Sequence, residues 1–155
     1  MRLALVLLSI FLSLEGFVAI LTGLGMIIAR EEVYGLMKKE FERALQEFNS
    51  THILSPEFFE RVYDFISIFA LTIGIAHLIT SLGILLLKKW ARIAAIALLG
   101  YQLVYSSLVI IFDISSILFV IVSALFIWYL FRKDVKEIFS GKKMSIEEKI
   151  LGKKI

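Results

Sequence analysis

Hydrophobic residues form long runs along this chain, and the charged residues are confined to the segments between them. Apart from Glu15 and Asp113, every charge lies in residues 1–2, 30–64, 88–92 or 132–155. Runs of this length are typical of helices that cross a bilayer, because about 20 consecutive apolar residues in a helix span the hydrocarbon core. The pattern therefore predicts an all-α integral membrane protein.

The apolar runs predict four membrane spans, at about residues 3–29, 65–87, 93–111 and 114–131. The last two spans come from one stretch of 39 residues, Ile93 to Phe131, in which Asp113 is the only charged residue. At about 1.5 Å per residue, a helix of that length is nearly twice as long as the hydrocarbon core is thick, so the stretch must fold back. Asp113, Ser115 and Ser116 supply the polar turn, because such side chains hydrogen-bond to nearby backbone groups.

The first apolar run could also be a signal peptide. It exceeds the roughly 7 to 15 residues of a signal-peptide hydrophobic region, and residues 25–29 contain no clear small-x-small cleavage site. An uncleaved first span is the favoured interpretation.

The positions of Lys and Arg predict the orientation of the spans. Twelve of them fall on one side, namely Arg2, three in residues 88–92 and eight in residues 132–155, whereas segment 30–64 has five basic and eight acidic residues. Because Lys and Arg accumulate in cytoplasmic loops, both ends are expected in the cytoplasm and segment 30–64 outside. We therefore expect a four-helix bundle at residues 1–139 in the cell membrane, followed by a basic cytoplasmic tail at 140–155 that suits anionic lipids.

Aromatic side chains near the ends of the predicted spans are expected to anchor the protein at the membrane surfaces. They are Phe58, Phe59 and Tyr63 on the outer side, and Trp90, Trp128 and Tyr129 on the inner side. Ser55-Pro56-Glu57 predicts the start of the helix that contains the second span. Residues 88–92 are expected to form a short basic elbow between spans, and Arg132 to Phe139 are expected to continue the last helix.

Segment 30–64 contains a pattern typical of an amphipathic helix of about 18 residues. Its apolar positions recur at three- and four-residue steps: Val33, Tyr34, Met37, Phe41, Ala44, Leu45 and Phe48. This helix could lie on the outer leaflet, pack against the mouth of its own bundle, or bind a partner, and packing against its own bundle is favoured. Asn49-Ser50-Thr51 also fits the glycosylation acceptor pattern, although Asn49 could equally end the helix.

Polar residues lie near the centre of each predicted span. Within one residue of the four midpoints are Glu15, His77, Gln102 and Ser123. A carboxylate at the centre of a spanning helix costs roughly 2.5–3.5 kcal/mol on insertion scales, so Glu15 is expected to face the bundle and to find a donor in His77 or Gln102. The favoured interpretation is a hydrogen-bonded cluster that fixes the register of the helices, and the alternative is a proton or ion relay or the bottom of a ligand cavity.

The composition excludes several classes of function. The hydrophobic fraction is 59%, the net charge of +3 is too small to indicate nucleic-acid binding, and the sequence contains no cysteine. One midplane histidine and one carboxylate are too few for a zinc site, and the sequence contains no phosphate-binding glycine loop and no His-Glu-x-x-His pair. We therefore expect no cofactor, no metal site and no catalytic activity.

Two segments carry a loose resemblance to a known group of proteins. The run from Gly83 to Arg92, with Lys88-Lys89-Trp90-Ala91-Arg92 between two spans, and the run from Tyr129 to Lys136 resemble small uncharacterised four-helix membrane proteins of prokaryotes. The richness in Lys, Glu and Ile without cysteine is similar to that of thermophile proteins, archaeal ones among them. The resemblance covers residues 65–139 and implies a fold but no activity.

These patterns favour a noncatalytic membrane protein that acts by association, as a homo-oligomer or as an accessory subunit of a membrane complex. Its expected partners are the lipid bilayer and either a second copy of itself or another membrane protein. The alternative is a small oligomeric transporter or channel, with the layer of Glu15, His77 and Gln102 on the permeation path.

Overall fold

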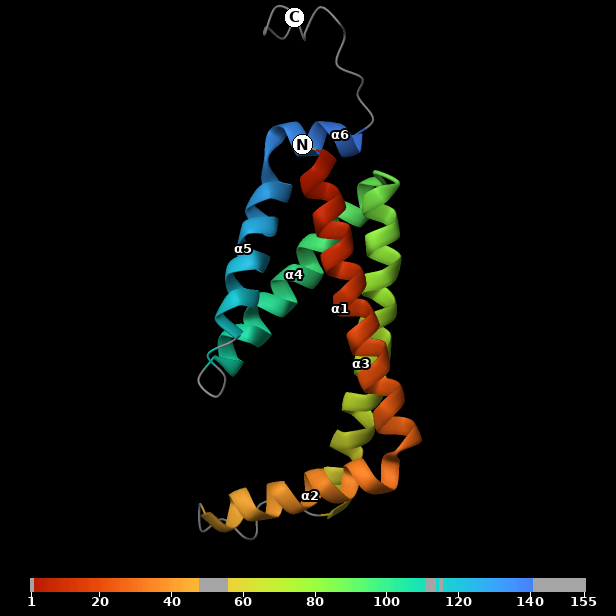
Figure 1. Ribbon diagram of the computed structural model, residues 1–155, viewed down its shortest axis with the longest axis vertical. Helices are drawn as coiled ribbons and strands as arrows, with labels where there is room; N and C mark the ends of the chain where they lie inside the picture. Colours follow the sequence, from red (N-terminus) through yellow and green to blue (C-terminus); the bar gives the residue numbers. More distant parts are fainter. Residues whose placement is uncertain (1, 48–55, 111–113, 115, 141–155) are drawn as a thin grey trace, which may run out of the picture. The chain divides into compact units, whose positions relative to one another are not determined.

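A computed structural model describes residues 2–47, 56–110, 114 and 116–140, and within these residues the chain is helical apart from short turns (Figure 1). The helices are α1 (Arg2–Ile28), α2 (Arg30–Glu47), α3 (Pro56–Leu85), α4 (Lys89–Val109), α5 (Ser116–Phe131) and α6 (Lys133–Ser140). The prediction of an all-α protein is thus confirmed for this part of the chain.

Three of the helices are long and apolar enough to cross a membrane. They comprise residues Leu3–Ile28 of α1, Glu57–Leu85 of α3 and Lys89–Val109 of α4. α5 and α6 together provide a fourth candidate if this pair, bent by 66°, is counted as one span. Spanning segments of this kind are helical because a helix satisfies its own backbone hydrogen bonds, which lipid cannot do.

Two compact units make up the chain, and each is described by itself. The first unit contains residues Met1–Phe11 and Ile79–Ile155, and the second contains Leu12–Leu78. α1 and α3 therefore each contribute one part to either unit.

In the first unit, α4 and α5 pack along each other and α6 contacts both. The start of α1 joins the end of α3 through two serines, since Ser81 Oγ donates to the Ser9 carbonyl at 2.9 Å and Ser9 Oγ donates to the Ser81 carbonyl at 3.2 Å. The buried apolar side chains of this unit form its core: Leu5, Leu8, Ile84, Ala91, Ala95, Leu98, Leu99, Leu130, Val135 and Phe139.

The connection between α3 and α4 is shorter than the predicted elbow at residues 88–92. Lys88 has extended backbone before the first helical residue, Lys89, so the remaining elbow residues form the first turn of α4. Leu87 closes the end of α3 in the left-handed region, with φ at 53°, and the Lys88 N–H donates to the Gly83 carbonyl at 2.9 Å. The predicted elbow is therefore wrong in its extent. Backbone hydrogen bonds close α3 after Leu85, two residues before the predicted end of the second span, and the connection comprises residues 86–88.

The sequence predicted that the last helix continues through Arg132 to Phe139. The structure shows instead that the chain bends between α5 and α6. It bends by 66° around Arg132, whose N–H donates to the Tyr129 carbonyl at 3.2 Å and whose side chain binds Asp134 at 3.0 Å. The bend allows Val135 and Phe139 to be buried in the contacts of α6 with α4 and α5. Burial of this apolar side explains why the helix breaks here.

In the second unit, α1 and α3 approach closely at three glycines. A Cβ atom built on Gly16 would lie 2.8 Å from the Gly74 carbonyl oxygen, and one built on Gly74 would lie 2.9 Å from the Ile20 nitrogen. Gly23 lies in a similar position, 2.9 Å from the Ser67 carbonyl oxygen. The absence of side chains at these glycines is what lets the two backbones come together.

α2 follows α1 after the single turn residue Ala29, and the chain changes direction there (Figure 1). Tyr34 and Phe41 of α2 pack on α3, with ring centroids 5.5 and 5.2 Å from that of Phe59. α2 spans 18 residues and coincides with the predicted amphipathic helix. Its aromatic side chains thus pack against the protein itself, which agrees with the favoured interpretation of this helix.

Candidate functional site

Two of the four predicted midplane residues contact each other in the first unit. Ser123 of α5 donates a hydrogen bond to Gln102 Oε1 of α4 at 3.3 Å, and both side chains are buried. A buried side-chain pair of this kind fixes how α4 and α5 face each other, because a helix rotation would leave the amide without its partner.

His77 lies in the second unit, on α3, with only 4% of its surface exposed. Its Nδ1 is 2.7 Å from the Ile73 carbonyl oxygen, and since a carbonyl can only accept, Nδ1 carries the hydrogen. Nε2 is buried without a hydrogen-bond partner among the described residues. A buried polar atom that stays unpaired costs roughly 1–3 kcal/mol, so this ring nitrogen needs an explanation.

Glu15 is partly buried on α1. The next residue, Gly16, faces His77, because a Cβ built on Gly16 would lie 3.0 Å from His77 Cβ. Glu15 and His77 belong to the second unit, whereas Gln102 and Ser123 belong to the first. The single layer of all four side chains therefore stays a prediction.

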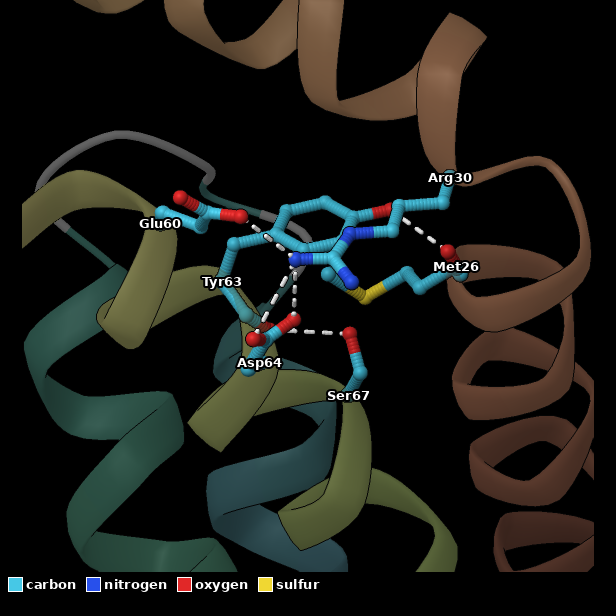
Figure 2. Close-up of polar contacts among 6 residues, drawn as sticks. All are labelled: Met26, Arg30, Glu60, Tyr63, Asp64 and Ser67. Carbon is cyan, nitrogen blue, oxygen red and sulfur yellow. Dashed lines mark hydrogen bonds and ion pairs between the residues drawn. The ribbon is translucent and has the colours of Figure 1, made fainter. Parts of the chain in front are cut away.

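A charged cluster that sequence analysis did not identify lies where α1 gives way to α2. Arg30 Nη2 is 2.9 Å from Glu60 Oε1 and 3.1 Å from Asp64 Oδ1, both on α3 (Figure 2). The three side chains are about half exposed, so the ion pairs contribute roughly 0–1 kcal/mol each. The sequence did contain a signal for this cluster. Arg30 directly follows the first apolar run, and Glu60 and Asp64, which are one helical turn apart, precede the second apolar run.

Tyr63 stands at the centre of this cluster and is 2% exposed. Its hydroxyl donates to the Met26 carbonyl at 2.6 Å, and its own carbonyl accepts the Ser67 hydroxyl at 2.8 Å (Figure 2). The ring also makes an edge-on contact with Tyr34, at 5.4 Å between centroids. Tyr63 was predicted to be an aromatic anchor at the level of the headgroups, and this depth stays a prediction. The protein itself covers its ring, because α1 and α2 both pack over this position of α3.

A pocket of about 320 Å³ opens beside the cluster. Its lining combines charged, polar and apolar side chains: Met26, Ile27, Arg30, Tyr63, Asp64, Ser67 and Ile68. The volume is at the lower end of the roughly 300–1,000 Å³ that is typical of small-molecule sites. The pocket can therefore hold one compact group.

The other predicted anchors are mostly exposed. Phe58, Trp90 and Trp128 are exposed, and Tyr129 is partly buried. The Arg132 guanidinium lies 5.7 Å from the centroid of the Trp128 ring, a distance at which a cation is attracted to the aromatic face. Phe59 is partly buried by its contacts with α2, and Asn49 lies outside the described residues.

Comparisons with protein-family models, with curated proteins and with solved structures find no match for the chain. The resemblance to four-helix membrane proteins of prokaryotes accordingly stays a prediction. Any functional conclusion rests on the geometry of the chain itself.

Proposed function

We propose that this is a noncatalytic multi-pass membrane protein that acts by association, as a homo-oligomer or as an accessory subunit of a membrane complex. The observation that carries the proposal is the large surface that the chain leaves uncovered. In the most apolar stretches of α1, α3 and α4, only 28%, 33% and 28% are buried by the chain. Lipid covers part of such a surface, and a partner helix covers it more specifically where small residues allow close approach.

α4 offers the best-defined surface for such a partner. Tyr101 and Tyr105 are both exposed and stack on each other, with 6.2 Å between ring centroids. Elsewhere on the same helix, a Cβ built on Gly100 would meet nothing within 4 Å among the described residues, so this glycine leaves a hollow on the helix surface. Exposed aromatic rings and such a hollow are both features against which a partner helix packs well.

The mass of the full chain, extracted from its native membrane in mild detergent, tests association. We expect the mass of a homo-oligomer or of a complex with a second protein. Gly100→Ile should shift the measured mass towards smaller species, because the new side chain fills the hollow at this glycine. Gly25→Ile is the matched control, since Gly25 also faces open space in a spanning helix but lies between aliphatic neighbours. A strictly monomeric wild-type protein without any co-purifying chain would contradict the proposal.

We further propose that the protein has four spans in the cell membrane, with both termini in the cytoplasm and α2 outside. The placement of Lys and Arg supports this orientation, and the basic tail then faces the anionic inner leaflet. Since the chain has no cysteine, a single introduced cysteine reports its own location. In intact cells a membrane-impermeant maleimide should label Lys39→Cys but not Lys88→Cys, and the reverse labelling would overturn the orientation.

The second candidate function is a small oligomeric transporter or channel. Nε2 of His77, which is buried and has no hydrogen-bond partner in the described part of the chain, favours it. A purely structural cluster would pair this nitrogen, whereas a proton relay uses an imidazole lone pair that can accept a proton. Proton flux into liposomes tests this candidate. Flux by the wild type that His77→Gln abolishes would support it, and a silent wild type would count against it.

A further inference from the structure

The pocket at the junction of α1 and α2 has opposite charges in its lining. Within the described residues, both carboxylate contacts of Arg30 fall on a single nitrogen, Nη2. The Nε–H and Nη1–H groups therefore remain as donors for a ligand. Asp64 adds a half-exposed carboxylate to the same lining. The pocket thus presents one cation and one anion within reach of one bound molecule.

Another part of the lining is apolar and lies at the surface. Ile27 is 47% exposed and Ile68 is 62% exposed, on α1 and α3 respectively. Arg30 is the first charged residue after the apolar stretch of α1, and Asp64 is the last before that of α3. The pocket therefore lies where the hydrocarbon core meets the headgroup region, with isoleucines on the hydrocarbon side.

We propose that this pocket binds the headgroup of a zwitterionic phospholipid that carries a primary ammonium group. The phosphate accepts hydrogen bonds from Arg30, the ammonium donates to Asp64, and an acyl chain lies over Ile27 and Ile68. The hydroxyl of Tyr63 is already bound to the Met26 carbonyl, so this residue forms the wall of the pocket and holds α1 and α3 at the required distance.

The charges in the pocket select against the other headgroup classes. A headgroup with only negative charge would meet the Asp64 carboxylate, and a ligand with only positive charge would meet the Arg30 guanidinium. A quaternary ammonium has no N–H hydrogen to donate to Asp64. The expected order of affinity is therefore phosphatidylethanolamine above phosphatidylcholine, and phosphatidylcholine above phosphatidylglycerol.

Native mass spectrometry of the full chain in mild detergent tests the proposal, with the three lipids added in separate titrations and with identical acyl chains. We expect a dissociation constant for phosphatidylethanolamine about tenfold lower than for phosphatidylglycerol. Arg30→Gln and Asp64→Asn should each raise the dissociation constant for phosphatidylethanolamine about tenfold or more, since each removes one charge-assisted hydrogen bond. Arg43→Gln is the matched control, because Arg43 carries the same charge on α2 but pairs with Glu40 and does not line the pocket.

A second variant keeps the test informative if loss of the ion pairs perturbs folding. Ile68→Trp keeps Arg30, Glu60 and Asp64 but fills the mouth of the pocket, so it should abolish the preference for phosphatidylethanolamine with unchanged helicity. Equal binding of all three lipids, or unchanged binding to Ile68→Trp, would overturn the proposal. Soluble phosphoethanolamine that binds while the lipids do not would also overturn it, in favour of a water-soluble ligand.

This inference goes beyond the proposed association of the protein. Lipid selectivity can fail while the protein still forms its complex, and the complex can be absent while the pocket still selects the lipid. The two experiments therefore distinguish failure of one proposal from failure of the other.

Discussion

Replacement of Gly74 by alanine tests the close approach of α1 and α3 directly. The added methyl carbon would lie 2.8 Å from the Gly16 carbonyl oxygen and 2.9 Å from the Ile20 nitrogen, and both atoms belong to the backbone. Backbone atoms cannot rotate away as a side chain can, so the helices must separate by roughly 0.6 Å to restore ordinary contact. A gap of that size forfeits about a quarter or more of the dispersion attraction across the contact.

The expected net effect combines two opposite contributions. Overpacking of a tight interface costs about 1–3 kcal/mol, whereas alanine is favoured over glycine within a helix by about 1 kcal/mol. We therefore expect Gly74→Ala to be less stable than the wild type by about 1 kcal/mol. Gly25→Ala supplies the control, because Gly25 faces open space on α1 and this change gains only the helix preference.

Thermal unfolding in detergent, followed by circular dichroism at 222 nm, measures the difference between the two variants. Gly25→Ala should have a Tm equal to or above that of the wild type, and Gly74→Ala should have a Tm lower by about 2–4 °C. The reasoning would be refuted if Gly74→Ala proved as stable as Gly25→Ala, because the two helices could then not be in backbone contact at this glycine.

Three further changes are expected to alter stability by about 1 kcal/mol or less in the same assay. Ser123→Ala leaves the Gln102 amide without its partner and should destabilise by about 0.6 kcal/mol, as is typical of hydrogen bonds between spanning helices. Tyr63→Phe removes the buried hydrogen bond to the Met26 carbonyl and should cost about 1 kcal/mol. Leu87→Gly should instead stabilise by about 0.5–1 kcal/mol, because leucine is strained at a φ of 53° and glycine is not.

Matched controls separate these effects from general perturbation. Ser107→Ala removes an exposed hydroxyl that, among the described residues, binds the Leu103 carbonyl of its own helix, so it should change the Tm very little. Leu86→Gly, one residue before Leu87, lies where the backbone N–H still bonds to Leu82, and there glycine should destabilise. If both glycine variants changed the Tm in the same direction, the assignment of strain to Leu87 would be wrong.

Much of the secondary structure could be predicted because it depends on local sequence. The apolar runs at residues 3–29 and 65–87 correspond to α1 and to the main part of α3, and α3 begins at Pro56, where the helix-start signal lies. The amphipathic segment forms α2. In each case the number of apolar residues, or their period along the chain, is sufficient to determine the helix.

The candidate sites could be predicted only in part. The spacing of polar residues placed Gln102 and Ser123 at one depth, and their side chains do meet. The same reasoning did not find the pairing of Arg30 with Glu60 and Asp64, although all three residues are visible in the sequence. Reasoning from charges assigned these residues to the extracytoplasmic segment without pairing them, whereas the reversal of the chain between α1 and α3 brings them together.

The sequence by itself determined which segments are helical, which are apolar enough to cross a membrane, and where the charges lie along the chain. Only the tertiary structure decided that α1 and α3 touch at glycines, that the helix bends around Arg132, and that Tyr63 is covered by protein. These features depend on contacts between residues far apart in sequence, and hydrophobicity has no direction that would select one such contact over another. Their selection requires the shapes and hydrogen-bonding groups of both partners at once.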